Sequence, residues 1–258
     1  MTSFIPATGQ RMRDWVDGLG QHALFTGKIA AAVCRRPIRY RRTVEAIYDS
    51  GVLSVFVICV AGFSVGMVLG LLFYLALAAF GSQERLGFVV GIALVRELAP
   101  VFTALLVTGR AGSAVTAEIG TMVVTEELDG LRMLSIDPVH FVVAPKAMAL
   151  LLVMPILTAF FALMGMGGAY LSGSVILGVD GGIFVTSLID AVDFEKDILG
   201  CLLKSVIFGG LLGLVATYRG YHCAPTSHGV SSATTQTVVV ASVSVLIFDY
   251  FITALWGF

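Results

Sequence analysis

The sequence predicts an all-α membrane protein with five transmembrane helices, preceded by an N-terminal amphipathic segment at the membrane interface. Composition is the first observation, because the 258 residues are 57% hydrophobic and 13% charged, with a mean hydropathy of +0.94. Soluble domains are about 25% charged. Five long apolar segments and an uneven distribution of lysine and arginine are the other two observations. We divide the chain into an interfacial segment, 1–46, and a five-span domain, 47–258.

Five segments are long and apolar enough to cross a membrane, which takes about 20 mostly apolar residues. They are Val52–Phe80, Leu86–Thr108, Ala147–Leu177, Ile198–Thr217 and Val238–Phe258. The first and third are longer than a bilayer requires, so we expect them to tilt, bend or continue past the headgroups. Pro155 provides a position for a bend in the third.

Lysine and arginine gather on one side of the predicted topology. That side carries twelve, namely Arg11, Arg13, Lys28, Arg35, Arg36, Arg39, Arg41, Arg42, Arg110, Arg132, Lys146 and Arg219. The loops on the other side carry only Arg85 and Lys196. Because basic residues stay in the cytoplasm, we expect a cytoplasmic N-terminus and an external C-terminus.

The first 46 residues are too polar to cross the bilayer. Apolar side chains alternate there with polar ones, and the basic run RRPIRYRR follows; the apolar residues are Trp15, Val16, Leu19, Leu24 and Phe25. This pattern predicts an amphipathic segment on the inner leaflet, facing anionic headgroups. A disordered cytoplasmic tail is the alternative.

The first span carries Gly62, Gly66 and Gly70 at intervals of four residues. On a helix these residues form one flat stripe, against which a second backbone can approach closely. The stripe therefore predicts a helix-packing contact, although glycine is also generally frequent in membrane helices.

Two adjacent charges, Arg96 and Glu97, lie near the centre of the second span, and Pro100 follows them. A charge at the bilayer centre costs about 2.5–3.5 kcal/mol, so it should face protein or a wet cavity. Adjacent helical residues point in different directions, so we expect each charge to find a partner across an interface or to meet a ligand headgroup. A purely structural charge network is the alternative.

Two further charges lie inside spans, Lys204 in the fourth and Asp249 in the fifth. Lys204 lies near the outer end, where its side chain could extend to the interface. Asp249 could pair with a basic group on a neighbouring span or serve as the acid of a proton relay.

The segment between spans two and three is too long and too patterned for a turn. Thr125 could cap a short helix with Glu126 and Glu127 in its first turn, and Asp137-Pro138 would end it. Leucines recur along one side, at Leu128, Leu131 and Leu134. A short helix with an exposed apolar ridge is suited to a groove on a partner protein. Packing on its own domain is the alternative.

The loop between spans three and four is acidic, with Asp180, Asp190, Asp193, Glu195 and Asp197 against Lys196. Apolar residues within it could form one face of a short surface helix, namely Ile183, Phe184, Leu188, Ile189 and Val192. An external partner could dock there. A loop that only caps the bundle and faces solvent agrees equally well with this pattern.

Several function classes lack their sequence signatures. No GxxxxGK[ST] phosphate-binding loop, HExxH motif or GxSxG motif occurs, so we expect a non-enzymatic chain without a metal or cofactor of its own. The four cysteines, Cys34, Cys59, Cys201 and Cys223, show no metal-ligand spacing. The formal net charge of −1 provides no case for nucleic acid as a partner.

Three blocks of this chain resemble the MlaE (YrbE) family of ABC-transporter permeases. The most specific runs from Arg96 to Pro138, RELAPVFTALLVTGRAGSAVTAEIGTMVVTEELDGLRMLSIDP. The others are GVLSVFVICVAGFSVGMVLGL in the first span and PTSHGVSSATTQTVV, Pro225 to Val239. Together they cover most of the chain from Gly51 onward.

The resemblance implies a homodimeric permease in the bacterial inner membrane that moves phospholipids and maintains outer-membrane asymmetry. Its implied partners are a cytoplasmic ATPase that binds ATP and Mg²⁺, a periplasmic MCE-domain hexamer and a small STAS-domain subunit. The family's coupling helix corresponds to Glu126–Ser135. Its buried pair corresponds to Arg96 and Glu97, beside a lipid cavity at the dimer axis.

On this interpretation Arg96 would meet lipid phosphate, while Leu69, Leu72 and Phe73 would supply apolar walls for acyl chains. The main alternative is a proton-coupled secondary lipid carrier that uses Glu97, Lys204 and Asp249 as a relay. A purely structural anchor for other subunits is a third possibility.

Overall fold

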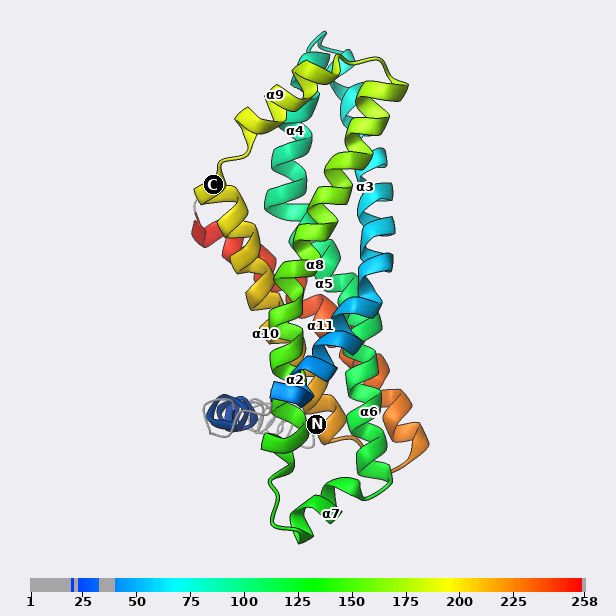
Figure 1. Ribbon diagram of the computed structural model, residues 1–258, viewed down its shortest axis with the longest axis vertical. Helices are drawn as coiled ribbons and strands as arrows, with labels where there is room; N and C mark the ends of the chain where they lie inside the picture. Colours follow the sequence, from blue (N-terminus) through cyan, green and yellow to red (C-terminus); the bar gives the residue numbers. More distant parts are fainter. Residues whose placement is uncertain (1–19, 21–22, 33–39, 257–258) are drawn as a thin grey trace, which may run out of the picture.

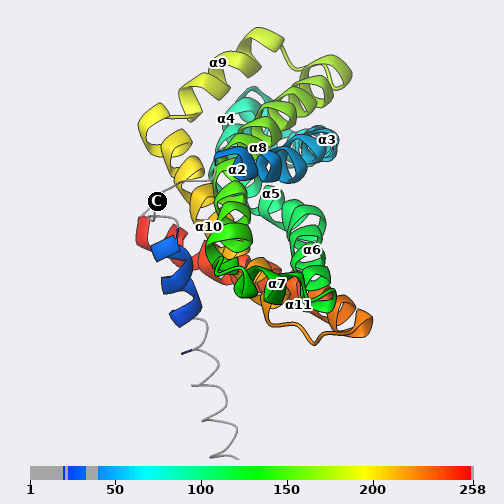
Figure 2. The same cartoon turned by 60° about the horizontal axis from the view of Figure 1, so that its bottom comes forward.

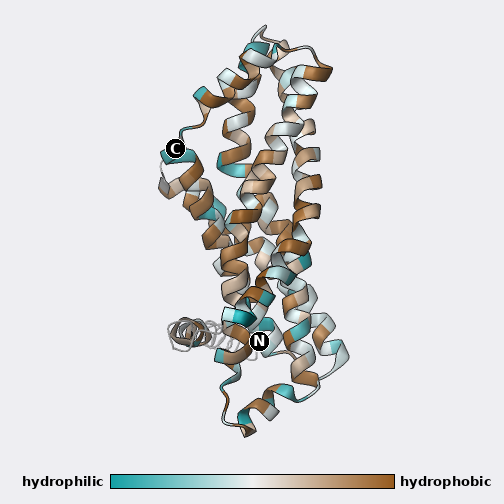
Figure 3. Cartoon of the chain, viewed as in Figure 1, coloured by the Kyte–Doolittle hydropathy of each residue, from teal (hydrophilic) through white to brown (hydrophobic). Residues whose placement is uncertain are grey.

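The computed structural model describes residues 20, 23–32 and 40–256, and this part of the chain is helical without strands. Its long helices form an elongated bundle (Figure 1). Five helical runs are long and apolar enough to span a membrane: Tyr40–Ala78, Gln83–Val124, Val139–Ile176, Glu195–Tyr221 and Ser227–Leu255. Apolar residues predominate along them (Figure 3). The prediction of an all-α protein with five spans is confirmed.

The first and third runs are each built around one long α-helix. The first joins α2 (Tyr40–Ile47) to α3 (Leu53–Ala78) through the π-helical turn η1 (Tyr48–Val52). The third contains α8 (Ala144–Tyr170) between the π-helical turns η5 (Val139–Val143) and η6 (Leu171–Ile176). Figure 1 shows α2 lying obliquely to α3, so the long first span changes direction within the helical run.

The second run is much longer than predicted. After the 3₁₀ turn η2 (Gln83–Arg85) it contains α4 (Leu86–Ala93), α5 (Ala99–Val107) and α6 (Ser113–Val124), separated by the π-helical turns η3 (Leu94–Leu98) and η4 (Thr108–Gly112). The expectation that a loop follows Thr108 is therefore wrong. Small residues such as Gly112 and Gly120 let this extension pack closely against Leu212 and Val230.

The fourth and fifth runs contain α10 (Leu199–Tyr221) and α11 (Ser227–Trp256). A π-helical turn, η7 (Phe194–Ile198), leads into α10. Helix α11 begins well before the predicted start at Val238. Its residues 227–237 are rich in serine and threonine, whose hydroxyls bond to carbonyls of the preceding turn, as Thr235 does to Ser231 at 3.1 Å.

The glycine stripe of α3 lies against α8. Gly62, Gly66 and Gly70 are all buried, and a Cβ atom built on them would meet the backbone of Phe161, Gly165 and Ala169 respectively. The two backbones are in direct contact at Gly66, where the added carbon would overlap the Gly165 carbonyl. Because glycine has no side chain, α3 and α8 can approach each other until their backbones touch.

A short helix, α9 (Gly181–Ala191), lies over the end of the bundle where α4 begins (Figure 1). Asp180 caps it, accepting a hydrogen bond from the Ile183 N–H at 3.0 Å. Phe184 is 1% exposed and packs with Leu86, Val90 and Ala169, so it faces the bundle. Ile183 and Ile189 remain exposed. The apolar residues of this helix thus lie on two faces, which corrects the expectation of one.

A helix over Ala23–Ala32 packs beside the opposite end of the bundle (Figure 2). Phe25, Ile29 and Ala32 are buried against the start of α8 and the end of α10, whereas Leu24 is 70% exposed. Trp15, Val16 and Leu19 lie outside the described residues. The described helix therefore has one face on the bundle, and its contact with a membrane stays a prediction.

Candidate functional site

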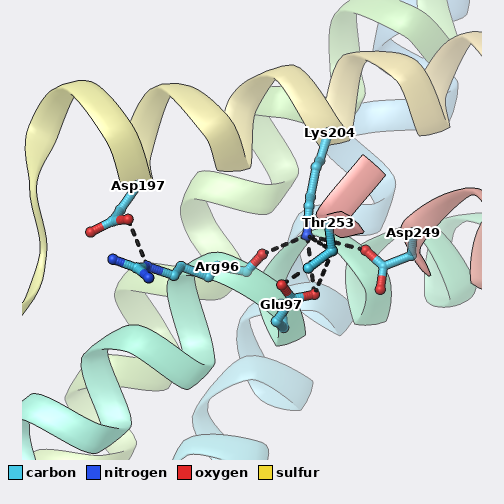
Figure 4. Close-up of polar contacts among 6 residues, drawn as sticks. All are labelled: Arg96, Glu97, Asp197, Lys204, Asp249 and Thr253. Carbon is cyan, nitrogen blue, oxygen red and sulfur yellow. Dashed lines mark hydrogen bonds and ion pairs between the residues drawn. The ribbon is translucent and has the colours of Figure 1, made fainter. Parts of the chain in front are cut away.

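Six polar residues from three helical runs meet inside the bundle (Figure 4). Arg96 and Glu97 lie on η3, Asp197 lies on η7, and Lys204 lies on α10. Asp249 and Thr253 lie on α11. We call these six residues the charge network. All of them belong to one chain, so the partners of Arg96 and Glu97 lie on other spans of the same protomer.

Pro100 explains why a lysine from another helix reaches the backbone here. Proline has no N–H, so it cannot donate the α-helical hydrogen bond that the carbonyl of Arg96, four residues earlier, would accept. Lys204 Nζ donates to that carbonyl at 3.1 Å. The π-helical turn η3 absorbs the irregularity, so the helix continues through the proline.

Lys204 is the centre of the network. Its ammonium donates to the Arg96 carbonyl, to Glu97 Oε2 at 3.0 Å and to Thr253 Oγ1 at 2.8 Å. These bonds use its three protons. Asp249 Oδ1 lies 3.4 Å from Nζ and forms an ion pair with it. The lysine side chain is 4% exposed, so the expectation that it extends to the membrane interface is wrong. Pairing of Asp249 with a basic group on a neighbouring span is confirmed.

Thr253 links Glu97 to Lys204. Its hydroxyl accepts from Lys204 and donates toward both carboxylate oxygens of Glu97 at 3.3 Å. Sequence reasoning missed this residue, because a threonine one turn after Asp249 on a membrane helix has no distinguishing signal.

Arg96 pairs with Asp197, with Nε 2.7 Å from Oδ1. The Asp197 side chain is 1% exposed, so it does not belong to the solvated acidic loop in which the sequence placed it. Asp197 Oδ2 also accepts from the Asp193 N–H at 2.8 Å, which fixes the carboxylate at the entrance to α10. In the sequence, the position of Asp197 directly before an apolar run is the feature that could have indicated its burial.

The network has a buried part and an accessible part. Lys204 and Asp197 are almost fully enclosed, whereas the side chains of Arg96 and Glu97 are 27% and 38% exposed. Two carboxylates, Glu97 and Asp249, share the ammonium of Lys204. This group of three side chains therefore carries one more negative than positive charge when all three are ionised. The buried members connect the spans, and the partly exposed ones leave one cation and one anion accessible.

The three residues expected to line an acyl-chain wall lie in different surroundings. Leu72 is exposed, Leu69 packs at the edge of the main core, and Phe73 packs near Leu86 and Phe184 under α9. Phe73 therefore belongs to the packing between α3 and its neighbours at that end. A role for these residues in binding acyl chains stays a prediction.

Helix α7 (Glu127–Met133) follows α6 at the end of the bundle opposite α9 (Figure 1). It begins after Glu126, whose φ of 61° is left-handed, and Ser135, with φ 59°, follows it. Thr125 is the C-cap of α6, and both its N–H and its hydroxyl donate to the Thr121 carbonyl. The expectations that Thr125 caps α7 and that Glu126 lies in its first turn are wrong, because Thr125 ends the preceding helix and Glu126 is the N-cap of α7.

The apolar ridge of α7 also differs from the prediction. Leu128 is 4% exposed and packs in the main core, and Leu131 is half-buried against it. Met133 and Leu134 are 86% and 72% exposed. Arg132 anchors the helix, donating to Asp129 and to the Tyr221 hydroxyl, each at 2.6 Å. These hydrogen bonds raise the pKa of the Arg132 guanidinium. The exposed apolar surface is thus the last turn of α7.

Hydroxyl contacts connect the α6–α7 segment to the last two spans. Thr116 Oγ1 lies 3.1 Å from the Ala216 carbonyl and 3.0 Å from Thr237 Oγ1. Lys146 on α8 also pairs with Glu118 on α6. Helix α6, which leads into α7, therefore contacts α8, α10 and α11.

The chain matches the family described as Permease MlaE over residues 43–255. It is 40% identical to the "Intermembrane phospholipid transport system permease protein MlaE" of Haemophilus influenzae, over 99% of this chain and 98% of the relative. It is 32% identical to a "Probable ABC transporter permease protein" of Rickettsia conorii, covering 97% and 96%. It is 30% identical to the Arabidopsis thaliana "Protein TRIGALACTOSYLDIACYLGLYCEROL 1, chloroplastic", covering 88% and 65%.

The five apolar helical runs, together with relatives named as permeases of ABC and phospholipid transport systems, indicate a multi-pass membrane transport subunit rather than an enzyme. The chain belongs to the MlaE permease family. The resemblance predicted from the Arg96–Pro138 block is confirmed. The proton-coupled carrier receives no support, because these relatives are named as components of ABC systems or of a phospholipid transport system.

Proposed function

We propose that this chain is the permease subunit of an ABC transporter that moves phospholipids between the inner membrane and a periplasmic MCE-protein route, thereby maintaining outer-membrane asymmetry. The observation that carries this proposal is similarity over nearly the whole chain to a permease named for intermembrane phospholipid transport. The charge network gives the proposal a chemical basis, because a phospholipid headgroup carries a phosphate and often an ammonium.

Arg96 and Glu97 are the proposed headgroup contacts. They are the most accessible charged members of the network, and each pairs with a second charged residue that fixes its position, Asp197 for Arg96 and Lys204 for Glu97. An arginine held in this way can form a charge-assisted hydrogen bond with a phosphate without losing much further side-chain freedom.

Replacing Arg96 by glutamine should reduce phospholipid transport about tenfold or more, because a hydrogen bond to a charged group contributes roughly 1.5–3 kcal/mol. The measurement is transfer of labelled phospholipid by the reconstituted complex. Arg96→Gln alone also leaves Asp197 buried without its counter-ion. The double variant Arg96→Gln/Asp197→Asn removes that complication, and we expect it to assemble normally and to remain inactive. Full transport by the double variant would assign Arg96 a purely structural role.

We further propose that two copies of the chain form a homodimer in the bacterial inner membrane, with N-termini in the cytoplasm and C-termini in the periplasm. The distribution of lysine and arginine supports this orientation. A separate ATPase would hold ATP and Mg²⁺ on the cytoplasmic side, together with a STAS-domain subunit, and an MCE-domain hexamer would lie on the periplasmic side.

The ATPase would dock on the last turn of α7. Met133 and Leu134 form an apolar surface beyond the membrane-spanning run, where water rather than lipid would surround it, so a partner gains by covering it. Closure of two ATPases would push α7, and the contacts of α6 would transmit the motion to α10 and α11.

Leu134→Asp should weaken binding of the ATPase subunit about tenfold or more, because a carboxylate would be buried in an apolar contact. Leu134→Met is the matched control, since it keeps the apolar surface, and it should bind as the unmodified chain does. Co-purification from membranes and titration of the purified ATPase measure the effect. Unchanged binding of Leu134→Asp would place the ATPase elsewhere.

A further inference from the structure

A polar cavity lies where α10 ends and α11 begins. Figure 1 shows this junction at the end of the bundle that carries α7. Its volume is about 610 Å³. Among the described residues, no acidic side chain lines this cavity. Much of the lining is formed by polar and basic side chains, which include Arg219, His222, Cys223, His228, Ser232 and Gln236. It shares none of its residues with the charge network.

Arg219 carries an unmet hydrogen-bond donor at this cavity. Its Nη1 donates to Gln236 Oε1 at 2.7 Å, whereas its Nε is buried without a hydrogen-bond partner among the described residues. This Nε has almost no exposed surface, so a ligand in the cavity cannot reach it without a movement of the side chain. An oxyanion in the cavity would instead accept a charge-assisted hydrogen bond from the guanidinium at Nη2.

The neighbouring side chains are oriented to complement an anion. Gln236 turns its oxygen to Arg219 and donates its N–H to Ser232 Oγ at 3.1 Å, which leaves the Ser232 proton able to point into the cavity. The carbonyl of Tyr218 lies 3.0 Å from His222 Nδ1, so this nitrogen donates to it and the ring is held in place. Helix α11 also begins here, and its N-terminal end carries a partial positive charge.

We propose that this cavity binds a phosphate group, either that of a membrane-lipid headgroup or free phosphate. The Arg219 guanidinium, an N–H of the His228 imidazole and the Ser232 hydroxyl are donors suited to phosphate oxygens. The cavity lies at the end of the apolar run Glu195–Tyr221, where lipid headgroups would surround the protein. Basic pockets between membrane helices on the cytoplasmic side are known to bind anionic headgroups.

Cys223 provides a reporter, because it is a free thiol in the cavity wall. Burial raises the pKa of this thiol, so its alkylation is best followed at mildly alkaline pH. The full-length chain is purified in maltoside micelles, which contain no phosphate. The alkylation rate of Cys223 is read by peptide mass spectrometry in potassium phosphate and in potassium chloride of equal ionic strength. A second arm adds phosphatidic acid or, as its matched control, diacylglycerol to the micelles in chloride buffer.

We expect alkylation to slow about threefold or more, as it would at a ligand concentration of roughly twice Kd. Protection by soluble phosphate alone identifies a free-phosphate site. Protection by phosphatidic acid but not by diacylglycerol identifies a headgroup site. Equal rates in all conditions, or equal protection by diacylglycerol, would overturn the proposal.

Arg219→Gln should abolish the protection, and Arg85→Gln at the other end of the bundle should leave it intact. His228 is exposed, so His228→Asn tests the cavity with little risk to folding, and it should weaken the protection. Protection that persists in both Arg219→Gln and His228→Asn would also overturn the proposal. The readout is independent of transport, so failure here leaves the proposed function unaffected.

Discussion

Lys204→Met should lower the free energy of unfolding by about 3–5 kcal/mol, the usual cost of removing one partner of a buried ion pair. The substitution preserves side-chain volume but leaves Glu97 and Asp249 facing each other without a cation, and it removes the donor to the Arg96 carbonyl. Thermal unfolding in detergent micelles measures the loss. Lys196→Met is the matched control, because that lysine is exposed, and it should change stability little.

Neutralising Glu97, Lys204 and Asp249 together separates the structural role of these three residues from their role in transport. The triple variant Glu97→Gln/Lys204→Met/Asp249→Asn buries no ionised group of the cluster, so it should recover most of the stability lost in Lys204→Met. We expect it to assemble and to transport poorly, because Glu97 no longer offers a charge to the lipid. If the triple variant transports normally, these three residues serve only to hold η3, α10 and α11 together.

Gly66→Ala should destabilise the protein by about 3 kcal/mol, at the upper end of the range for an overpacked core. The added carbon would overlap the backbone carbonyl of Gly165, and a backbone cannot rotate away as a side chain can. Helices α3 and α8 would have to separate along their whole contact, which includes Gly62 and Gly70. Thermal unfolding in micelles again provides the measurement.

Gly167→Ala is the matched control on the other side of this contact. A Cβ atom at Gly167 meets nothing within 4 Å, and the residue lies inside α8. Alanine favours a helix over glycine by about 1 kcal/mol, so this variant should be neutral or slightly stabilising. Equal effects at Gly66 and Gly167 would show that helix propensity, rather than the close approach of two backbones, governs the role of these glycines.

Much of the architecture could be predicted from local sequence. The five spans are runs of apolar residues, and their number needs no knowledge of packing. The glycine stripe of α3 indicated close packing against another helix, but it did not indicate that this helix would be α8. The Arg96–Pro138 block was specific enough to indicate the family. Each of these features is periodic or contiguous along the chain, so each can be seen in the sequence alone.

The second run shows where local reasoning stops. Arg110 interrupts the apolar pattern and suggested a loop, yet it lies in the helical turn η4 and donates to the Asp49 carbonyl at 3.0 Å and to Ser54 Oγ at 2.7 Å. The partner lies about sixty residues earlier in the chain, so no pattern near Arg110 could reveal it. The burial of Leu128 in helix α7 could not be predicted locally either, because it depends on contacts with elements that are distant in the sequence.

The apolar spans, the positions of the charges within them and the missing N–H of Pro100 follow from the sequence by itself, because each depends on the chemistry of neighbouring residues. Only the tertiary structure decided which charges meet. Arg96 pairs with Asp197 and Glu97 with Lys204 across more than a hundred positions of chain. Pairing inside a membrane depends on which helix faces are brought together, and that arrangement is a property of the whole bundle.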